Sequence, residues 1–266
     1  MSNTQKSLDK LGKEIVEMLY EKKMIMTWYR DKPEGWKLAN GMYSPYYINM
    51  RVVPSFPELY YKVQDAMCEL VVNAGYRPKE RSPQDKLLGL AMAGISLSNA
   101  ITLGTRIPSL YTRKLSDEIK TKEDLNRHLE AVWSGISSHG QHKLIEGELT
   151  DGDRIGIVDD LVTSFTSKEL GIRQLQIEAQ NRNVKVIVED IFVLLNREQG
   201  ADAIAAKLGY TIHSVIPFIS KGLEWLKGPL EQNEYNTIID YVRHPDSFQS
   251  ELMQQSLVAV AKNRRQ

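Results

Sequence analysis

Residues 155–168, IGIVDDLVTSFTSK, join an apolar run to two adjacent carboxylates and then to a hydroxyl-rich turn. The run predicts a buried strand that ends at Asp159 and Asp160, and the turn predicts a helix that opens at Lys168. Backbone N–H groups and hydroxyls at a helix start can bind phosphate, because the helix dipole favours an anion there. The carboxylates can accept hydrogen bonds from a sugar or face a metal-bearing pyrophosphate. The stretch therefore predicts a site for a phosphorylated ribose, although a strand followed by a Thr/Ser helix cap fits the same pattern.

Short apolar runs alternate with helical stretches on both sides of this motif. The runs are LLGLAM at 87–92, PSLYT at 108–112, RIGIVDD at 154–160, VKVIVEDIFVLL at 184–195 and TIHSVI at 211–216. Strands that alternate with helices imply right-handed crossovers, so the sequence predicts an α/β fold with a Rossmann-like central parallel sheet flanked by helices. Ligands of such sheets bind at the carboxyl ends of the strands. The positions that follow the strands are Ala93-Gly94, Arg113-Lys114, Asp159-Asp160 and Asn196-Arg197.

The segments that flank the alternating region predict a division into three parts. Amphipathic helices are predicted at 7–23 and 58–74, and the aromatic, Gly- and Pro-punctuated stretch between them predicts a hairpin or flap. We expect an N-terminal helix and hood at 1–57, an α/β core at 58–220 and a helical C-terminal extension at 221–266.

The charge balance and the apolar content favour an ordinary globular protein. Lys+Arg and Asp+Glu both number 34, so no global field favours nucleic acid or an anionic membrane, and any anion site has to be local. The single cysteine, Cys68, lies among apolar residues, which predicts core packing. The N-terminus lacks a hydrophobic signal core and no apolar run reaches membrane-spanning length, so we expect no membrane partner and a cytoplasmic location.

Five separate segments, in order, agree with one known family. They are SPYYINMR at 44–51, TRK at 112–114, HGQHKLIEGEL at 139–149, IVDDLVTSFTS at 157–167 and FVLLNREQG at 192–200. Through them the chain resembles type I phosphoribosyltransferases, and specifically orotate phosphoribosyltransferases, over roughly residues 35–225. GQHKLIEGEL and NREQG discriminate most, because the paired aspartates occur throughout the superfamily.

The resemblance implies transfer of ribose 5-phosphate from phosphoribosyl pyrophosphate to orotate, which forms orotidine 5'-phosphate and pyrophosphate in pyrimidine biosynthesis. The base nitrogen would displace pyrophosphate through an oxocarbenium-like transition state, so that catalysis comes from positioning, charge stabilisation and exclusion of water. By resemblance, Arg113 and Lys114 bind the pyrophosphate, His139 approaches the leaving group, and Asp160 stabilises charge or handles a proton.

The same resemblance implies the binding residues. Asp159 and Asp160 would hold the ribose hydroxyls, and the 5-phosphate would bind the loop residues Thr163, Ser164, Phe165, Thr166 and Ser167. Arg197, Thr163 and Tyr47 would contact the base, with the planar fork of Arg197 meeting a carboxylate or carbonyl edge. Mg²⁺ would be the cofactor, held by pyrophosphate oxygens and water, with Asp159 as the protein group that could face it. A homodimer is also implied.

Several ligand-facing positions depart from the family pattern. Phe165 stands where a glycine is usual, and a phenylalanine resists φ > 0 and adds bulk, which predicts weaker binding of phosphate. Ala39 replaces a flap lysine, although Lys37 is near, Ala93 replaces a lysine of the first binding loop, and Asn196 replaces an aspartate.

The polar segment 115–142, called the lid segment below, is longer than an ordinary connection. A mobile lid and a surface insertion with a helix near 122–133 both fit its composition. Asp117 occupies the position of the family's lid lysine, which leaves Lys120, Lys122 or Lys143 as replacements.

The departures keep two alternatives open. One is a catalytically weakened regulatory relative that binds phosphoribosyl pyrophosphate or a nucleotide, and the other is a phosphoribosyltransferase for another base. A DNA-binding regulator would need a basic helix-turn-helix module, which the sequence lacks.

Overall fold

The computed structural model describes residues 3–38, 41–116, 118–127 and 143–264. The chain divides into two compact units, one formed by Met1–Tyr60 together with Ile216–Gln266 and the other by Tyr61–Val215. The two ends of the chain therefore share one unit, and the motif at 155–168 lies in the other.

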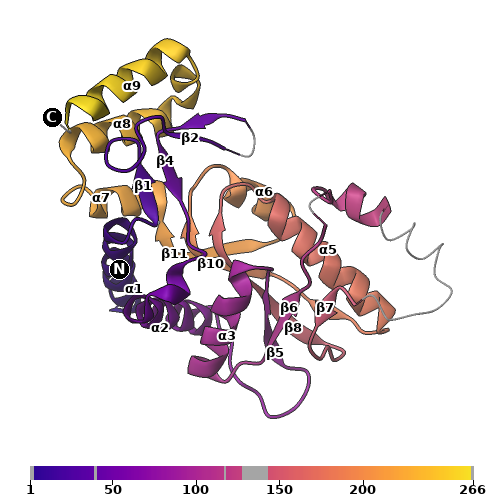
Figure 1. Ribbon diagram of the computed structural model, residues 1–266. Helices are drawn as coiled ribbons and strands as arrows, with labels where there is room; N and C mark the ends of the chain where they lie inside the picture. Colours follow the sequence, from indigo (N-terminus) through magenta and orange to yellow (C-terminus); the bar gives the residue numbers. More distant parts are fainter. Residues whose placement is uncertain (1–2, 39–40, 117, 128–142, 265–266) are drawn as a thin grey trace. The chain divides into compact units, whose positions relative to one another are not determined.

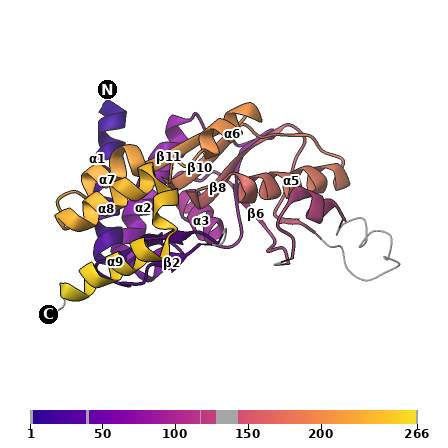
Figure 2. The ribbon, with the colours of Figure 1, turned by 90° about the horizontal axis from the view of Figure 1, so that it is seen from above.

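The unit Tyr61–Val215 is built on a parallel sheet. Its elements are β5 (Asp85–Gly89), α3 (Ala93–Thr105), β6 (Ser109–Thr112), β7 (Ile145–Glu146), β8 (Asp153–Val162), α5 (Thr166–Asn181), β9 (Val186–Ile187), β10 (Asp190–Asn196), α6 (Ala201–Lys207) and β11 (Thr211–Pro217). Among the described residues the strand order is β11-β10-β8-β5-β6-β7, and β9 also pairs with β8. Figure 1 shows β5, β6, β8 and β10 side by side, and Figure 2 shows β6, β8 and β10 again from above. The predicted α/β fold with a parallel central sheet is confirmed.

The direction of the crossovers places the ligand edge of this sheet. The chain passes from β5 to β6 on one side and from β8 to β10 on the other, and β5 and β8 are neighbours. Right-handed crossovers in opposite directions put α3 and α5 on opposite faces of the sheet. The order of strands thus reverses between β5 and β8, which is the point where sheets of this kind bind ligands.

Strand β8 differs from its prediction at the carboxyl end. The apolar residues Ile155, Ile157 and Val158 are fully buried as expected. The aspartates do not end the strand, however, because β10 pairs with β8 through the register Val193↔Asp159 as far as Asn196↔Val162. The acidic side chains therefore stand on a hydrogen-bonded strand, which fixes their backbone.

The apolar run VKVIVEDIFVLL forms two strands, whereas the sequence predicts a single one. β9 pairs with the first residues of β8 and β10 pairs with the later ones. The antiparallel edge strand β7 was not predicted, because Ile145–Glu146 is too short for a periodic pattern. Residues 122–127 are helical, in agreement with the helix predicted near 122–133, and the rest of that helix lies outside the described residues.

The other unit combines short strands with helices. Its elements are α1 (Asn3–Glu21), β1 (Ile25–Thr27), β2 (Trp36–Lys37), β3 (Tyr43–Ser44), β4 (Tyr46–Ile48), η1 (Val53–Ser55), η2 (Phe218–Gly222), α7 (Leu223–Trp225), α8 (Gln232–Arg243), η3 (Pro245–Phe248) and α9 (Glu251–Asn263), and α2 (Pro57–Asn73) begins in it. β2 and β3 form the hairpin expected between the first two helices, and β1 pairs with β4.

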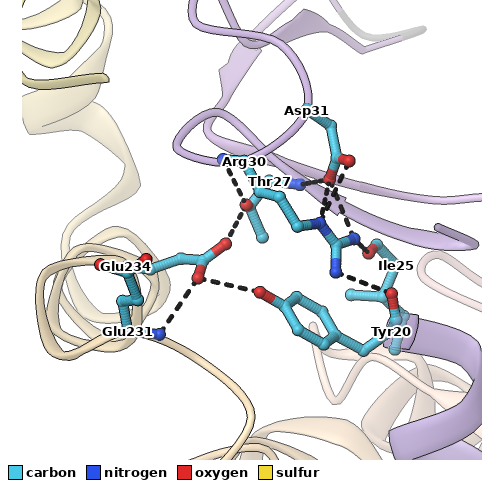
Figure 3. A network of polar contacts seen from close by, with 7 residues as sticks. All are labelled: Tyr20, Ile25, Thr27, Arg30, Asp31, Glu231 and Glu234. Carbon is cyan, nitrogen blue, oxygen red and sulfur yellow. Dashed lines mark hydrogen bonds and ion pairs between the residues drawn. The ribbon is translucent and has the colours of Figure 1, made fainter. Parts of the chain in front are cut away.

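A buried carboxylate joins the N-terminal and C-terminal segments within this unit (Figure 3). Glu234 of α8, only 1% exposed, accepts hydrogen bonds from the Tyr20 hydroxyl at 3.0 Å and from the Thr27 hydroxyl. It also accepts a bond from the backbone N–H of Glu231 at 3.2 Å, as part of a capping box at the start of α8. Arg30 donates to the carbonyl oxygens of Tyr20 and Ile25, both at 2.8 Å. Since every one of these groups needs its partner when buried, the extension after residue 220 is part of the fold of this unit.

Candidate active site at the carboxyl edge of the sheet

A pocket of about 280 Å³ opens where β5, β6 and β8 end. The residues around it come from the loops after these strands and from the first turns of α5, and they include Arg113, Lys114, Asp159 and Ser167. These four residues were selected from the sequence at separate positions. The fold brings them together at the predicted edge, because parallel strands end on the same side of a sheet.

The acid pair, Asp159 and Asp160, is held by local hydrogen bonds. An oxygen of Asp159 accepts from the N–H of Asp160 at 2.9 Å, and an oxygen of Asp160 accepts from the N–H of Leu161 at 2.7 Å. Burial, and next to it the negative charge of Asp159, raises the pKa of Asp160 to about 6. Lys168 and the N–H of Leu161 oppose this rise. Asp160 can therefore exchange a proton near neutral pH, as the catalytic role predicted for it requires.

Lys168 is a residue of this site whose role the sequence pattern does not indicate. The pattern predicts it only as the start of a helix, but its side chain is buried and its Nζ lies 2.8 Å from Oδ2 of Asp159. The sequence carries no signal for this role, because helix periodicity does not state which face of α5 meets β8. Two further polar groups support the pocket. The buried Gln174 amide donates to the carbonyl of Arg113 at 3.0 Å, and Glu146 pairs with Arg113.

The loop Thr163–Ser167, called the phosphate loop below, leads from β8 into α5, which begins at Thr166. Ser164, Thr166 and Ser167 are exposed, so their hydroxyls are accessible. The first backbone N–H groups of any helix lack partners within the helix and point outward along its axis. The loop thus presents donors suited to an anion, and binding of the 5-phosphate there stays a prediction.

The side chain of Phe165 points away from the phosphate-binding side of its loop, contrary to the steric conflict predicted from the sequence. Its φ of −81° lies in the ordinary right-handed region, so the position does not require a glycine. Its side chain is 2% exposed, belongs to the hydrophobic core, and stacks on Tyr210 with 5.9 Å between ring centroids. The expected steric conflict with phosphate is therefore wrong, because the bulk of the ring points into the core.

The basic pair after β6 lies at the rim of the pocket. Both side chains are exposed, and Nε of Arg113 lies 2.8 Å from Oε1 of Glu146 on β7. In the lid segment, Lys122 forms an ion pair of 2.8 Å with Glu169 in the first turn of α5. Of the three candidate lid lysines, Lys122 is therefore the one that contacts the helix beside the pocket. Lys120 is exposed, and Lys143 is exposed just before β7.

The turn after β10 holds Arg197 in a buried position, and its N–H donates to the carbonyl of Val162 at 2.9 Å. The preceding residue, Asn196, donates from its amide to both carboxylate oxygens of Asp202 at 3.0 and 2.9 Å. An aspartate at this position would bring two carboxylates together, so Asn196 is matched to Asp202. Ala93 begins α3 after the first loop, where the backbone N–H of Ala91 donates to the hydroxyl of Thr112 at 2.8 Å.

Several predicted residues do not line this pocket, among them Asp160, Thr163 and Arg197. His139 and Ala39 lie outside the described residues. Tyr47 belongs to the unit that contains the chain ends, where it stands on β4, 37% exposed, and stacks on Trp36 with 6.1 Å between ring centroids. Its role at the base therefore stays a prediction.

The described residues contain no group of three or more His, Cys, Asp or Glu side chains arranged to hold a metal ion. In the same part of the chain, no helix has the length and apolarity needed to cross a bilayer.

Known proteins with similar sequences were found, although no family model matches the chain. It is 28% identical to the orotate phosphoribosyltransferase of Saccharolobus solfataricus, over 85% of this chain and 95% of that protein. It is 29% identical to the orotate phosphoribosyltransferase of Staphylothermus marinus, over 76% of this chain and 80% of that protein.

Solved structures with the same fold were also found. UMP synthase of Leishmania donovani matches with a TM-score of 0.64 and 22% identity over 87% of this chain, which spans 42% of that longer chain. The orotate phosphoribosyltransferase of Aeropyrum pernix matches with a TM-score of 0.57 and 20% identity, over 81% of this chain and 97% of that one. At these identities the two structures support the fold alone.

The parallel sheet, with paired aspartates, a helix start and a basic pair at its carboxyl edge, has the architecture of a type I phosphoribosyltransferase. The curated relatives, at 27–29% identity, support that family for this chain. Its named relatives extend over most of the chain. Within the family, the chain groups with the orotate phosphoribosyltransferases.

Proposed function

We propose that the chain transfers ribose 5-phosphate from phosphoribosyl pyrophosphate to orotate, and that the pocket at the carboxyl edge of the sheet is its active site. The observation that supports this most is the gathering of Arg113, Lys114, Asp159 and Ser167 around one pocket. A phosphorylated sugar with a pyrophosphate at its anomeric carbon needs donors at both ends and acceptors in the middle. Around the pocket, Arg113 and Lys114 are donors, Asp159 is an acceptor, and Ser167 belongs to the phosphate loop.

Each group has a task that its position allows. The phosphate loop binds the 5-phosphate with backbone N–H groups and hydroxyls, and the acid pair accepts hydrogen bonds from the ribose hydroxyls. Arg113 and Lys114 stabilise the negative charge that develops on the departing pyrophosphate. Asp160 holds or accepts a proton near neutral pH, because its pKa is raised to about 6.

Arg197 is proposed to bind the base. A guanidinium group can meet a carboxylate with two parallel hydrogen bonds, a geometry that suits orotate and offers less to a neutral purine. A contact of Tyr47 with the base is proposed on the resemblance alone. An enzyme for another base remains the alternative, which the choice of base in the assay decides.

Magnesium fits this pocket as a substrate-held ion. Asp159 already accepts from Lys168 and from the N–H of Asp160, so its oxygens are engaged within the protein. Mg²⁺ favours octahedral coordination by phosphate oxygens and water, and the acid pair can accept hydrogen bonds from such waters. When bound, the ion would neutralise charge on the pyrophosphate.

The test is a spectrophotometric assay with orotate, phosphoribosyl pyrophosphate and Mg²⁺, together with calorimetry of phosphoribosyl pyrophosphate binding. We expect binding and turnover, and adenine in place of orotate should give no product. Tight binding without turnover on any base would instead support the regulatory relative. The homodimer and the cytoplasmic location are proposed on the resemblance alone, and light scattering after size-exclusion chromatography measures the first.

A further inference from the structure

Lys168 has an environment that is unusual for a lysine. Its side chain is only 3% exposed. Lysines are almost never buried to this extent unless a partner satisfies the charge. Its Nζ lies 2.8 Å from Oδ2 of Asp159, 2.5 Å from the carbonyl oxygen of Leu161 and 3.3 Å from the hydroxyl of Ser167. An ammonium group has three donors and no acceptor. The three contacts therefore use its full capacity for hydrogen bonds.

This saturation decides between two roles for the lysine. A lysine beside a phosphate loop could bind the phosphate directly, but that would require it to give up a contact with Asp159, Leu161 or Ser167. Loss of the contact with Asp159 would leave the buried ammonium group without its counter-charge, which is costly. The geometry favours a lysine that acts on the protein rather than on the ligand.

The three acceptors have distinct places in the site. Asp159 lines the pocket, the carbonyl of Leu161 belongs to the end of β8, and Ser167 belongs to the first turn of α5. One ammonium group therefore connects the acid pair to both sides of the phosphate loop. Phe165, inside that loop, fills the core on the other side. The loop is thus fixed by Phe165 within it and by Lys168 directly after it.

We propose that Lys168 is a positioning residue of the active site, which orients the Asp159 carboxylate and fixes the phosphate loop so that both can receive phosphoribosyl pyrophosphate. The inference rests on the proposed function. Ordering the carboxylate and the loop before the ligand arrives removes part of the entropy cost of binding. Loss of Lys168 should therefore weaken binding of phosphoribosyl pyrophosphate, with little effect on the KM for orotate.

The experiment compares Lys168→Met with a matched control, Lys86→Met. Lys86 is equally buried and lies 2.7 Å from Asp153, at the opposite end of β8 and away from the pocket. We expect Lys168→Met to raise the KM and calorimetric Kd for phosphoribosyl pyrophosphate by about 10- to 100-fold, in line with hydrogen bonds to charged groups. Lys86→Met should leave both within about twofold. Lys168→Gln, which keeps donors for Asp159 and Leu161, should recover part of the affinity, and it replaces Lys168→Met if that variant does not fold.

A second arm tests whether Lys168 acts through Asp159. Against an Asp159→Asn background, Lys168→Met should change the Kd by a smaller factor than in the wild-type background, because only the contacts to Leu161 and Ser167 are then lost. If Lys168→Met and Lys86→Met lost equal affinity for phosphoribosyl pyrophosphate, or if Lys168→Met bound it like wild type, the positioning role of Lys168 would be refuted while the proposed function would stand. A wild-type protein that neither binds phosphoribosyl pyrophosphate nor turns it over would refute the proposed function first.

Discussion

At the first residue of β8, Asp153 pairs with Lys86 at 2.7 Å, and near the end of the same strand Asp159 pairs with Lys168 at 2.8 Å. Both lysines are buried, and both aspartates lie on β8. The surroundings differ. Asp153 is fully buried and also accepts from the N–H groups of Gln84 at 2.9 Å and Thr150 at 2.7 Å, whereas the Asp159 side chain is 13% exposed and lines a pocket.

The two ends of β8 teach that a buried ion pair does not by itself mark a functional site. At the amino end, the buried pair holds the sheet together. The buried Asp190 on the neighbouring strand β10 has a similar structural role, since it contacts Arg154, Tyr76 and His213. The carboxyl end uses the same chemistry to hold a carboxylate that a ligand can reach. Access from a pocket, rather than burial or pairing, separates the two.

The largest expected effect separates the ends of β8 most directly. Asp153→Asn leaves Lys86 buried without its counter-charge, so the free energy of unfolding should fall by about 3–5 kcal/mol. Binding of phosphoribosyl pyrophosphate by the folded protein should stay within about twofold. Urea unfolding and calorimetry measure the two quantities.

Asp159→Asn is the counterpart at the carboxyl end. It should weaken binding of phosphoribosyl pyrophosphate by about 100-fold or more, because an amide replaces the charged acceptor of the ribose hydroxyls. Binding that is unchanged in Asp159→Asn, or lost in a folded Asp153→Asn protein, would contradict the comparison.

Phe165→Ala tests a residue of the phosphate loop whose side chain is buried in the core. Removal of a buried ring should lower the free energy of unfolding by about 3 kcal/mol. Affinity for phosphoribosyl pyrophosphate should not improve. Tighter binding by Phe165→Ala or Phe165→Gly would mean that the ring does obstruct the phosphate after all.

Asp160→Asn should affect stability and catalysis in opposite directions. The pKa of Asp160 is raised from 3.8 to about 6 in the folded protein, so its ionisation destabilises the fold above pH 6 and has no cost below about pH 4. The Asn variant should therefore be more stable than wild type by on the order of 2 kcal/mol at pH 8, and this gain should vanish as the pH falls through 6 towards 4. Transfer should slow by about 100-fold. Unfolding curves at both pH values and the orotate assay measure these effects, and an unchanged stability difference across pH would count against a raised pKa.

The smallest effect concerns the turn before Arg197. Asn196→Asp places a carboxylate against Asp202 and should reduce the free energy of unfolding by about 1 kcal/mol at pH 8. Adding Asp202→Asn should restore the free energy of unfolding, because an amide and a carboxylate then face each other again. If Asn196→Asp were stabilising, the pairing of Asn196 with Asp202 would not explain the departure from the family pattern.

Much of this site could be predicted from local sequence. The strand 155–158, the paired aspartates and the hydroxyl-rich turn lie within a few residues of one another, and their roles follow from their chemistry and order. Arg113 and Lys114 could be chosen because they follow an apolar run, and the parallel sheet then brings the ends of such runs to one edge.

Other features depended on which way a side chain turns. Phe165 and Lys168 lie at the same helix start. The sequence predicts a steric conflict with phosphate at Phe165 and only a helix start at Lys168. The fold turns Phe165 towards Tyr210 and Lys168 towards Asp159. Spacing along the chain does not state which face of α5 meets the strand, and so both assignments were incomplete.

By itself, the sequence determined the class of fold, the family and the edge of the sheet where the chemistry belongs, because these depend on periodicity and on residues adjacent in the chain. The tertiary structure alone decided that Asp159 is held by a buried lysine, that burial raises the pKa of Asp160, and that Phe165 belongs to the core. The physical reason is that burial and electrostatic contact are properties of the packed chain. Both depend on groups brought within a few ångströms by the fold, whose distances the order of residues does not contain.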